Sequence, residues 1–481
     1  MSSRFRLIAV IALCGWCSIG GFASVNNPAG SGSRSIEPEP TADKVWVEVQ
    51  ARSAEELVEL ASEGLVEPNW CGYPRDLTAD GFVDKTQISQ LLSRGLKVAR
   101  SADAEARAAD RTSVISLNDA GSSSDLDGYL SVDAINQLVH SLPSRFPYIC
   151  RLVHAPRASI QGRPIDGIRI GVDVETIEKP GVFLQGGLHG NELEPPEALL
   201  NFAVQLLQAY TDGASVVFGG KTFSATIVRR IVNQLDVIVM PLMNPDGRAF
   251  IQSTGVGGRK NRRHTCSVPE SDGVDLNRNF DFLWAADVPS TSADPCNVFY
   301  RGAQAFSEPE SRNMRDLLDR FPNILTFCDE HTAFGQFYFP WGDDDNQTSD
   351  PSKNFRNPFY NDVRGIFGNT PEGNAYKEFI RVSELSRFRT AGASIGDALM
   401  AAGNVPYPVG GLGEVTQVAY NAVALNYVYG RHIVTPSSPR IWAFSFEAAL
   451  PPVNPKQHVF AVTGAMAGQM CQLILSSAFP Q

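Results

Sequence analysis

The sequence predicts an α/β fold: a mixed, mostly parallel central sheet flanked by helices, preceded by a small α+β module at the N-terminus. Three almost continuous apolar runs, Leu235–Pro241, Ile324–Cys328 and Ile441–Phe446, are typical of central strands in a parallel sheet. Stretches with helical spacing lie between the predicted strands, as expected when helices connect parallel strands. In such a sheet ligands bind beyond the carboxyl ends of the strands, so polar residues at those ends are the first candidates for a site.

The length, composition and charge of the chain limit the classes of protein to which it can belong. The chain has 481 residues, a hydrophobic share of 43% and a formal net charge of −11. These values fit an ordinary globular protein of two or three domains, although a single α/β domain of about 300 residues would also fit within the chain. The chain has no long run of lysine or arginine, so it lacks the basic surface that nucleic-acid binding requires. Nucleic acids and other polyanions are therefore not expected partners.

The N-terminus has the pattern of an export signal. Arg4 and Arg6 precede an apolar run from Leu7 to Ala23, as in a signal peptide that is removed on export. We predict a signal peptide over residues 1–24 and a flexible leader over 25–43, with an uncleaved membrane anchor as the alternative. Export implies a secreted or periplasmic location and no further membrane partner, and we expect a monomer. An oxidising compartment also permits disulfides among Cys71, Cys150, Cys266, Cys296, Cys328 and Cys471.

Residues 44–100 are predicted to form the α+β module. Val45–Val49 alternates like a strand, and Ala54–Ala61 and Lys85–Leu92 carry helical apolar spacing. Asp76–Gly81 is interpreted as a turn, because a calcium loop beginning at Asp76 would need a glutamate where Gln87 stands. The small, polar segment 101–127 predicts a linker.

The main domain is predicted over residues 128–481. Its first elements are a helix at Val132–Leu142, strands at Pro164–Val172 and Val182–Leu184, and a helix at Ala198–Tyr210. Gly342–Gly410 is a long polar stretch that we interpret as a loop over the rim of a cleft. Within it, the run Asp343–Asp345 predicts a solvated loop, with an extracellular calcium site as the alternative.

The candidate chemistry begins at His189 and Glu192, which follow the strand at Val182–Leu184 after two glycines. An imidazole and a carboxylate three residues apart form a ligand pair for zinc, and a catalytic zinc normally has three protein ligands and one open position. His331 follows the strand Ile324–Cys328 and is predicted to be the third ligand. We therefore expect one Zn²⁺ ion.

Other predicted strand ends and loops supply residues suited to hydrolysis. Glu447 directly follows Ile441–Phe446, so loss of solvent should raise its pKa toward that of a general base. Asn277 and Arg278 place an amide beside a guanidinium, which suits the binding of a carboxylate through two hydrogen bonds. Arg259 is a candidate for stabilising an oxyanion.

Together these motifs resemble the zinc metallocarboxypeptidases of the carboxypeptidase A kind, over about residues 128–477. The matching segments are Tyr129–Val132, Gln161–Ile165, His189–Glu192, Pro241–Gly247, Arg259–Lys260, Gly273–Arg278, Asp294–Cys296, His331 ahead of Tyr338–Gly342, and Phe444–Glu447. The conjunction is far more specific than any single segment. It implies a carboxypeptidase-like fold and hydrolysis of the C-terminal peptide bond of peptides or proteins.

The resemblance also implies a role for each candidate residue. Three residues would bind zinc: His189, Glu192 and His331. Glu447 would take a proton from the attacking water and pass it to the leaving amine, while Arg259 polarises the scissile carbonyl. Asn277, Arg278 and a mobile tyrosine would bind the terminal carboxylate of the substrate.

The tyrosine is assigned to Tyr429, with Tyr427 as the alternative, because Asn426–Gly430 replaces the Asp-Trp-x-Tyr-Gly usual in the family. Gly258 is a second departure, since the family often has tryptophan before the arginine. The resemblance further implies a disulfide between Cys266 and Cys296.

Other hypotheses stay open at this point. A zinc amidase or deacylase could use the same scaffold on non-peptide amides or on cell-wall stem peptides. Two further hypotheses are a binding module that has lost catalysis and a membrane-tethered form of the enzyme. The stretch between Gly430 and Phe446 contains no acid, which argues against a preference for C-terminal lysine or arginine. Arg431 and Arg440 leave a preference for acidic residues as an alternative, and we expect an apolar or broad preference.

Overall fold

The computed structural model describes residues 44–66, 77–101, 128–174, 179–286, 288, 290–344, 347–368, 371, 373, 375–451, 454–476 and 478–479, all within the unit Asp43–Gln481. The predicted signal peptide, the leader and nearly all of the linker lie outside these residues, as do Cys71 and Asp345.

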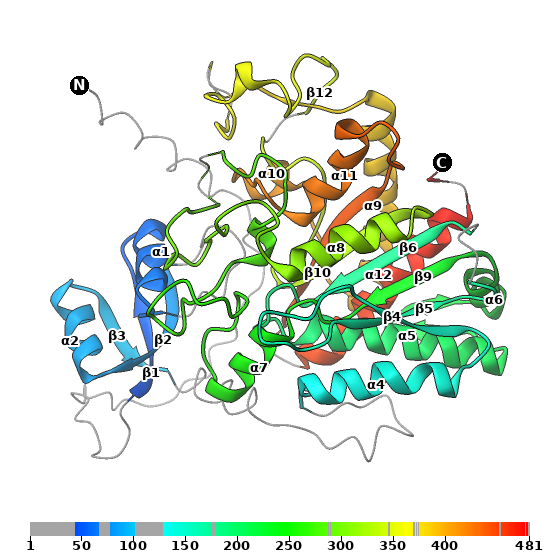
Figure 1. Ribbon diagram of the computed structural model, residues 1–481, viewed down its shortest axis with the longest axis horizontal. Helices are drawn as coiled ribbons and strands as arrows, with labels where there is room; N and C mark the ends of the chain where they lie inside the picture. The colour runs from blue at the N-terminus through cyan, green and yellow to red at the C-terminus, as the bar shows by residue number, and fades with distance from the viewer. Residues whose placement is uncertain are drawn as a thin grey trace, which may run out of the picture. The chain divides into compact units, whose positions relative to one another are not determined.

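An eight-stranded mixed sheet forms the centre of the fold (Figure 1). In spatial order its strands are β14 (Val409–Gly411), β11 (Gln336–Phe339), β15 (Trp442–Ala449), β10 (Ile324–Ala333), β6 (Gly181–Gly186), β9 (Asp236–Met240), β5 (Asp166–Ile170) and β4 (Cys150–His154). The four middle strands β15, β10, β6 and β9 run parallel. Antiparallel pairs occur between β11 and β15 and among β9, β5 and β4. The predicted mixed, mostly parallel sheet is therefore confirmed.

The apolar runs located the middle strands well, but β10 is longer than predicted. It continues through Asp329, Glu330 and His331 to Ala333, because these polar side chains are buried and bonded rather than exposed in a loop. The short strands β4, β11 and β14 were not predicted, since none of them carries a long apolar run.

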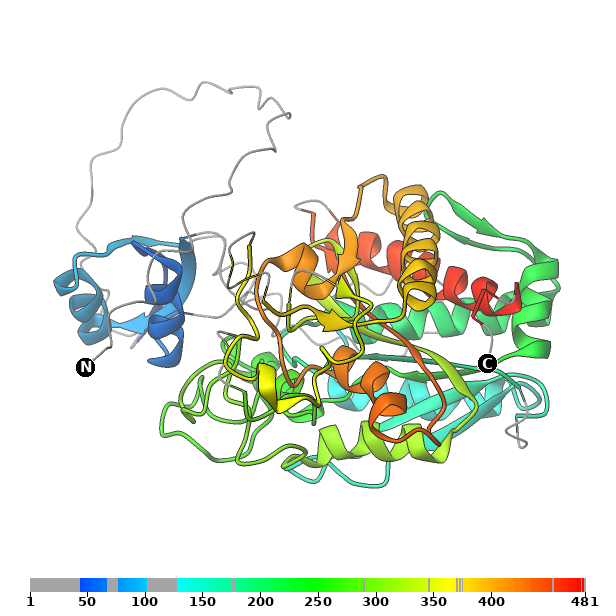
Figure 2. The same ribbon diagram turned by 90° about the horizontal axis from the view of Figure 1, so that it is seen from above.

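Helices cover both faces of the sheet. They are α4 (Val132–Arg145), α5 (Glu194–Asp212), α6 (Ala225–Gln234), α7 (Pro245–Thr254), α8 (Pro309–Arg320), α9 (Val382–Gly403), α10 (Leu412–Thr416), α11 (Ala424–Val434) and α12 (Pro455–Leu475). Figure 2 shows α8 and α11 on one side of the sheet and α5 and α12 on the other. Among the described helices, α12 alone is long and apolar enough to cross a membrane, but 78% of that stretch is buried inside the molecule.

Helix α5 illustrates why a strand–turn–helix unit forms after β6. Pro195 and Pro196 stand in the first turn, where a missing N–H costs no helical hydrogen bond. The helix ends at Gly213, whose φ of 63° is a conformation that glycine adopts without strain. The turn between β6 and α5 carries the first two predicted metal ligands.

The alternation of side chains along β10 and β15 assigns each residue to a face. Phe444 and Trp442 contact Phe388 of α9, and Glu330 accepts a hydrogen bond from Thr463 of α12. The intervening residues of both strands point to the opposite face, since successive side chains of a strand alternate. His331 and Glu447 share that opposite face, because they are direct partners in the parallel register of β10 and β15.

The N-terminal residues form the small α+β module. Its sheet has the order β2 (Thr78–Asp84), β1 (Lys44–Gln50), β3 (Lys97–Arg100) with antiparallel pairs, and its helices are α1 (Ala54–Ser62) and α2 (Lys85–Ser93). The expected turn at 76–81 is wrong for residues 78–81: they lie in β2, where Ala79 and Gly81 are buried against the module core. Gly81 fits there because a Cβ would lie 2.1 Å from the carbonyl oxygen of Leu65.

The interpretation of Gly342–Gly410 as a rim loop is only partly correct. The stretch holds two short paired strands, β12 (Gln347–Thr348) and β13 (Glu378–Phe379), and the 3₁₀ turn η3 (Pro358–Tyr360). It then forms the 22-residue helix α9, which buries Phe388, Ala391, Ile395 and Leu399 along one stripe. That stripe has helical spacing, so the sequence did contain the signal for this helix.

Candidate metal centre and substrate pocket

The three predicted ligands come from adjacent parallel strands. His189 and Glu192 lie in the turn after β6, and His331 lies near the carboxyl end of the neighbouring strand β10. The turn requires glycine at position 190, where a Cβ would lie 2.3 Å from the backbone of Gly247 and Arg248. This close approach fixes the path of the chain between the two ligands of the turn.

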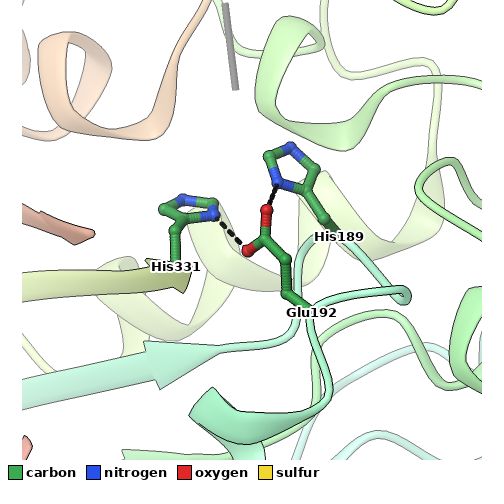
Figure 3. A group of neighbouring side chains, drawn as sticks. All are labelled: His189, Glu192 and His331. Atoms are coloured by element: carbon green, nitrogen blue, oxygen red, sulfur yellow. Dashed lines mark hydrogen bonds and ion pairs between the residues drawn. The ribbon is translucent and has the colours of Figure 1, made fainter. Parts of the chain in front are cut away.

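Figure 3 shows one carboxylate held between two imidazole rings. Nδ1 of His189 is 2.6 Å from Oε1 of Glu192, and Nδ1 of His331 is 3.0 Å from Oε2. Potential ligand atoms of the three residues lie within 4.8 Å of one another, and all three side chains are buried. Two imidazole nitrogens and one carboxylate oxygen are the donor set of many catalytic zinc sites, so the residues present fit zinc.

Two further carboxylates orient the imidazole rings. Asp275 Oδ1 lies 3.3 Å from Nε2 of His189, and Asp329 Oδ2 lies 2.8 Å from Nε2 of His331. Each contact fixes the ring so that Nδ1 points to the centre, which is the usual support for a metal-binding histidine. Asp275 was not among the predicted site residues, although it lies two residues before Asn277 in a matched motif.

The electrostatics of the centre favour a carboxylate that stays ionised. Burial raises the pKa of Glu192, but the charges of His189 and His331 outweigh this effect and leave the pKa well below its usual value. Burial likewise raises the pKa of Asp275, and the neighbouring Arg259 and Arg278 lower it well below its usual range. The centre therefore holds negative charge facing the imidazoles.

Asp329 and Glu330 are adjacent acids that precede His331 in β10. The structure separates them: Asp329 contacts His331, whereas Glu330 faces α12 on the opposite side of the sheet. Both are buried, so neither is solvated. Burial, with Asp329 nearby, raises the pKa of Glu330 well above its usual value.

A pocket beside the metal centre brings most of the predicted residues together. Its lining consists of His189, Asn277, Arg278, His331, Tyr338, Leu412, Tyr420, Val423, Leu425, Ser445 and Glu447. Glu447 is 5% exposed and enters from β15 at the position paired with His331. The Glu447 carboxylate therefore faces the same space as the predicted metal ligands His189 and His331.

Asn277 and Arg278 lie in the 3₁₀ turn η2 (Leu276–Arg278) at one wall of this pocket. The Asn277 side-chain oxygen accepts a hydrogen bond from the backbone N–H of Ala424, which holds the amide in place. The guanidinium of Arg278 donates to the backbone oxygens of Ser290 and Asn277. Its carbon also lies 5.4 Å from the centre of the Tyr420 ring.

Arg259 contacts the candidate metal centre at His189 but is not among the residues that line the pocket. Nε and Nη2 donate to Oδ2 of Asp275 at 3.1 and 2.8 Å, and Nη1 is 3.3 Å from Nδ1 of His189. The guanidinium is thus within hydrogen-bonding distance of a predicted metal ligand while a buried carboxylate fixes its orientation.

The structure does not bring Tyr429 to the pocket. Its side chain is fully buried on α11, where its hydroxyl donates to Oε2 of Glu384 and its ring packs against Trp341 and Phe388. Tyr427, the alternative, stacks on Phe280 at 5.9 Å and is also outside the pocket. Both belong to α11, whose side chains pack into the surrounding core.

Two tyrosines line the pocket, Tyr338 and Tyr420. Tyr420 is the one that packs against Arg278, and the sequence prediction did not name it. It precedes α11 and stands among the small and apolar residues Val418, Ala419, Ala422 and Val423, a setting that is typical of a core residue. Its contact with Arg278 distinguishes Tyr420 from the other tyrosines near the pocket.

The expected disulfide is present: Cys266 and Cys296 are bonded, with their Cα atoms 5.2 Å apart. Within the described part of the chain, the other cysteines are free and buried: Cys150, Cys328 and Cys471. Both cysteines of this disulfide lie in the segment between Arg259 and Tyr300.

A mixed sheet that delivers two histidines and a glutamate to the carboxyl ends of its parallel strands defines an α/β protein with a candidate metal centre. The sequence pattern described as zinc carboxypeptidase, Peptidase_M14, matches residues 135–430. The chain belongs to this family.

Relatives support the same assignment. The chain is 30% identical over 223 residues to carboxypeptidase B of Helicoverpa zea, covering 45% of this chain and 47% of that protein. It is 31% identical over 222 residues to carboxypeptidase B of Astacus astacus, covering 45% and 66%. The chain thus spans about half the length of the first of these relatives.

Solved structures agree on the fold. Carboxypeptidase A of Helicoverpa armigera aligns with a TM-score of 0.60 at 19% identity, covering 90% of this chain and 99% of that one. Thrombin activatable fibrinolysis inhibitor aligns with a TM-score of 0.62 at 16% identity, covering 91% and 99%.

Proposed function

We propose that the chain is an exported zinc-dependent carboxypeptidase that hydrolyses the C-terminal peptide bond of peptides or proteins. The observation that carries the proposal is a single pocket lined by two of the predicted metal ligands, the general-base candidate Glu447, and the anion-binding pair Asn277 and Arg278. A free terminal carboxylate is the substrate group that fits this pair.

Each residue of the centre has a separate chemical role. His189, Glu192 and His331 would hold one zinc ion, which when bound polarises a carbonyl and lowers the pKa of water to about 7. Glu447 accepts a proton from the attacking water and donates it to the leaving amine.

Substrate binding uses the other side chains of the centre. Arg259 stabilises negative charge on the scissile carbonyl oxygen, and Arg278 with Asn277 binds the terminal carboxylate. We assign the mobile tyrosine role to Tyr420 in place of Tyr429, because Tyr420 lines the pocket and lies over Arg278. A carboxylate anchored beside the metal would confine cleavage to the last peptide bond.

The pocket supports an apolar or broad preference for the C-terminal side chain. Leu412, Val423 and Leu425 supply its apolar wall. We expect release of leucine, phenylalanine and similar residues from a mixed peptide library, and loss of this release when a chelator removes zinc. Mass spectrometry of the shortened peptides measures both. Absence of chelator-sensitive release would refute the proposed function, and release of lysine or arginine alone would refute the preference.

We further propose that the module at 44–100 is a pro-segment that restrains the main domain, 128–481. Val298 and Phe299 of the main domain belong to the apolar cluster of the module. The ring of Phe299 lies 5.8 Å from the Arg259 guanidinium carbon and 5.3 Å from that of Arg278. A docked module therefore touches the residue that packs on both active-site arginines.

Limited proteolysis tests this restraint. Cleavage at Arg107 or Arg111 in the linker should separate the two parts, and kcat/KM for a C-terminal apolar substrate should then rise. Activity is measured before and after cleavage, with mass spectrometry to locate the cut. Equal activity in the two forms would contradict a restraining role.

A further inference from the structure

The backbone of Tyr420, which lines the substrate pocket, is held by a buried segment that lies shortly after β11. The segment is residues 341–344, and all four are buried. Asp343 and Asp344 belong to it, so the solvated loop expected at this aspartate run is wrong for these two residues. The backbone N–H of Tyr420 donates to the carbonyl oxygen of Gly342 at 2.6 Å. This bond attaches the pocket tyrosine to the interior of the main domain.

Asn426 makes a second attachment to the same backbone. It lies in the first turn of α11 and is fully buried. Its Nδ2 donates to the carbonyl oxygen of Tyr420 at 3.0 Å, and its Oδ1 accepts from the backbone N–H of Gly342 at 3.2 Å. The reverse orientation of the amide would place its oxygen against a carbonyl oxygen, so only this orientation satisfies all the groups. The three residues form a closed ring of hydrogen bonds, which we call the Tyr420 anchor.

The residues of the Tyr420 anchor are closely packed. A Cβ at Gly342 would lie 3.1 Å from Nδ2 of Asn426, 3.1 Å from Cβ of Tyr420 and 2.7 Å from the side chain of Leu412. Leu412 is itself part of the apolar wall of the pocket. Glycine is therefore required at position 342, because the anchor and the apolar wall meet there.

The chain after Tyr420 is attached to the opposite wall of the pocket. The backbone N–H of Ala422 donates to the carbonyl oxygen of Phe282 at 2.7 Å. The backbone N–H of Ala424 donates to Oδ1 of Asn277, one of the two residues assigned to carboxylate binding. The backbone of Tyr420 is thus held from two directions, so a change in the position of its ring requires rotation of the side chain alone.

The anchor needs an amide at position 426. An ionised aspartate has only acceptor oxygens. It could accept from the N–H of Gly342, but its second oxygen would lie against the carbonyl oxygen of Tyr420. The motif usual in the family, Asp-Trp-x-Tyr-Gly, has aspartate here, so the amide of Asn426 is a departure of this chain.

We propose that Asn426 is a positioning residue for substrate binding, which holds the ring of Tyr420 over Arg278 through the anchor. The ring centre lies 5.4 Å from the guanidinium carbon of Arg278, where the terminal carboxylate of the substrate would bind. The inference rests on the proposed function of the pocket. A tyrosine whose backbone is already ordered loses less conformational entropy on binding, so Asn426 strengthens binding and does not take part in the chemical step.

Binding of a small carboxylic acid to the full, zinc-loaded chain tests the inference without hydrolysis. The probe is 3-phenylpropanoate, which carries a carboxylate and an apolar ring but no peptide bond, and calorimetry measures its Kd. Asn426→Asp should raise this Kd about fivefold to tenfold, within the range expected for one lost hydrogen bond. Asn426→Ala should raise it at least as much, although it adds no charge. Asn233→Asp, which adds the same charge at an exposed asparagine of α6, should leave it unchanged.

Tyr420→Phe separates positioning from general damage to the fold. This variant removes the hydroxyl but keeps the ring, and it should weaken binding of the probe by itself. In the Tyr420→Phe background, Asn426→Asp should change Kd by less than about twofold, because the amide acts through the tyrosine. A merely structural role would give the same factor in both backgrounds, and that result would overturn the inference.

Kinetics with a peptide that ends in an apolar residue give a second measurement. Asn426→Asp should raise KM by about the same factor as Kd and leave kcat within about twofold. The inference would be overturned if the native chain does not bind the probe, if Kd is unchanged in both variants at position 426, or if kcat falls while KM stays the same. A native chain that binds the probe in the expected pattern but hydrolyses no peptide would refute the proposed function and leave the role of Asn426 in carboxylate binding intact.

Discussion

Replacing Glu447 with glutamine is expected to lower kcat about 10³-fold while the zinc content stays at one ion per chain, because general acid–base groups contribute roughly 10²–10⁴-fold. Glu447 pairs with His331 across β15 and β10, so its carboxylate lines the pocket beside the metal ligands. Glutamine keeps the shape and hydrogen-bonding capacity but cannot accept the proton. The measurements are kcat and KM for release of a C-terminal apolar residue, together with zinc content by elemental mass spectrometry.

The matched control is Asp397→Asn, which neutralises an exposed acid on α9. It should leave kcat, KM and zinc content unchanged. A substrate bound through Arg278 and Asn277 should keep its KM within a few-fold in Glu447→Gln, since those residues are untouched. Full activity in the glutamine variant would mean that another group moves the proton, and the proposed mechanism would then fail at its central step.

The sequence was enough to locate the strands that carry the predicted metal ligands, because the apolar runs of these strands are a local signal. Val182–Leu184 and Ile324–Cys328 are apolar runs that end in polar residues, and parallel strands place those ends along one edge. The structure brings His189, Glu192 and His331 together there. No local pattern could show the register of β10 with β15, which pairs His331 with Glu447, because register depends on contacts between distant segments.

The sequence could also have predicted in part that Asp329 and Glu330 face opposite sides of the sheet. Adjacent residues of a strand face opposite sides, so only one of the two acids could share the face of His331. The predicted strand ended at Cys328, so this argument was not applied to the two acids. Their burial depends on α12, a helix more than 120 residues later in the chain.

Tyr429 lies outside the pocket for a reason that the sequence does not show. A match by motif selected Tyr429, but α11 turns its side chain into a core formed with Trp341 and Phe388. Tyr420 carries no motif of its own in this sequence, and only its position beside Arg278 identifies it. The buried aspartates Asp343 and Asp344 show the same limit of sequence patterns. A run of acids predicts solvent exposure, and only the packing of distant segments shows that these two are buried.

Replacing His331 with alanine is expected to have the other large effect: loss of bound zinc and of measurable activity together. Two remaining ligands, His189 and Glu192, would leave the ion without the three protein donors that a catalytic zinc normally has. We expect zinc affinity to fall more than about 100-fold, since even changes to residues supporting a ligand typically cost about 10–100-fold. Competition with a chromogenic chelator measures the affinity, and circular dichroism checks the fold.

Three further variants separate ligand loss from general damage. Asp329→Asn should lower zinc affinity by the smaller factor of about 10–100, because it removes the carboxylate beside Nε2 of His331 but keeps the ligand. Glu330→Gln, one residue later, should leave zinc affinity unchanged because that side chain faces α12. His264→Ala, at a side chain that is 86% exposed, should also leave it unchanged. If Asp329→Asn binds zinc as tightly as the native chain, the contact at Nε2 does not orient the His331 ring. If His331→Ala retains its zinc, this histidine is not a ligand of the metal centre.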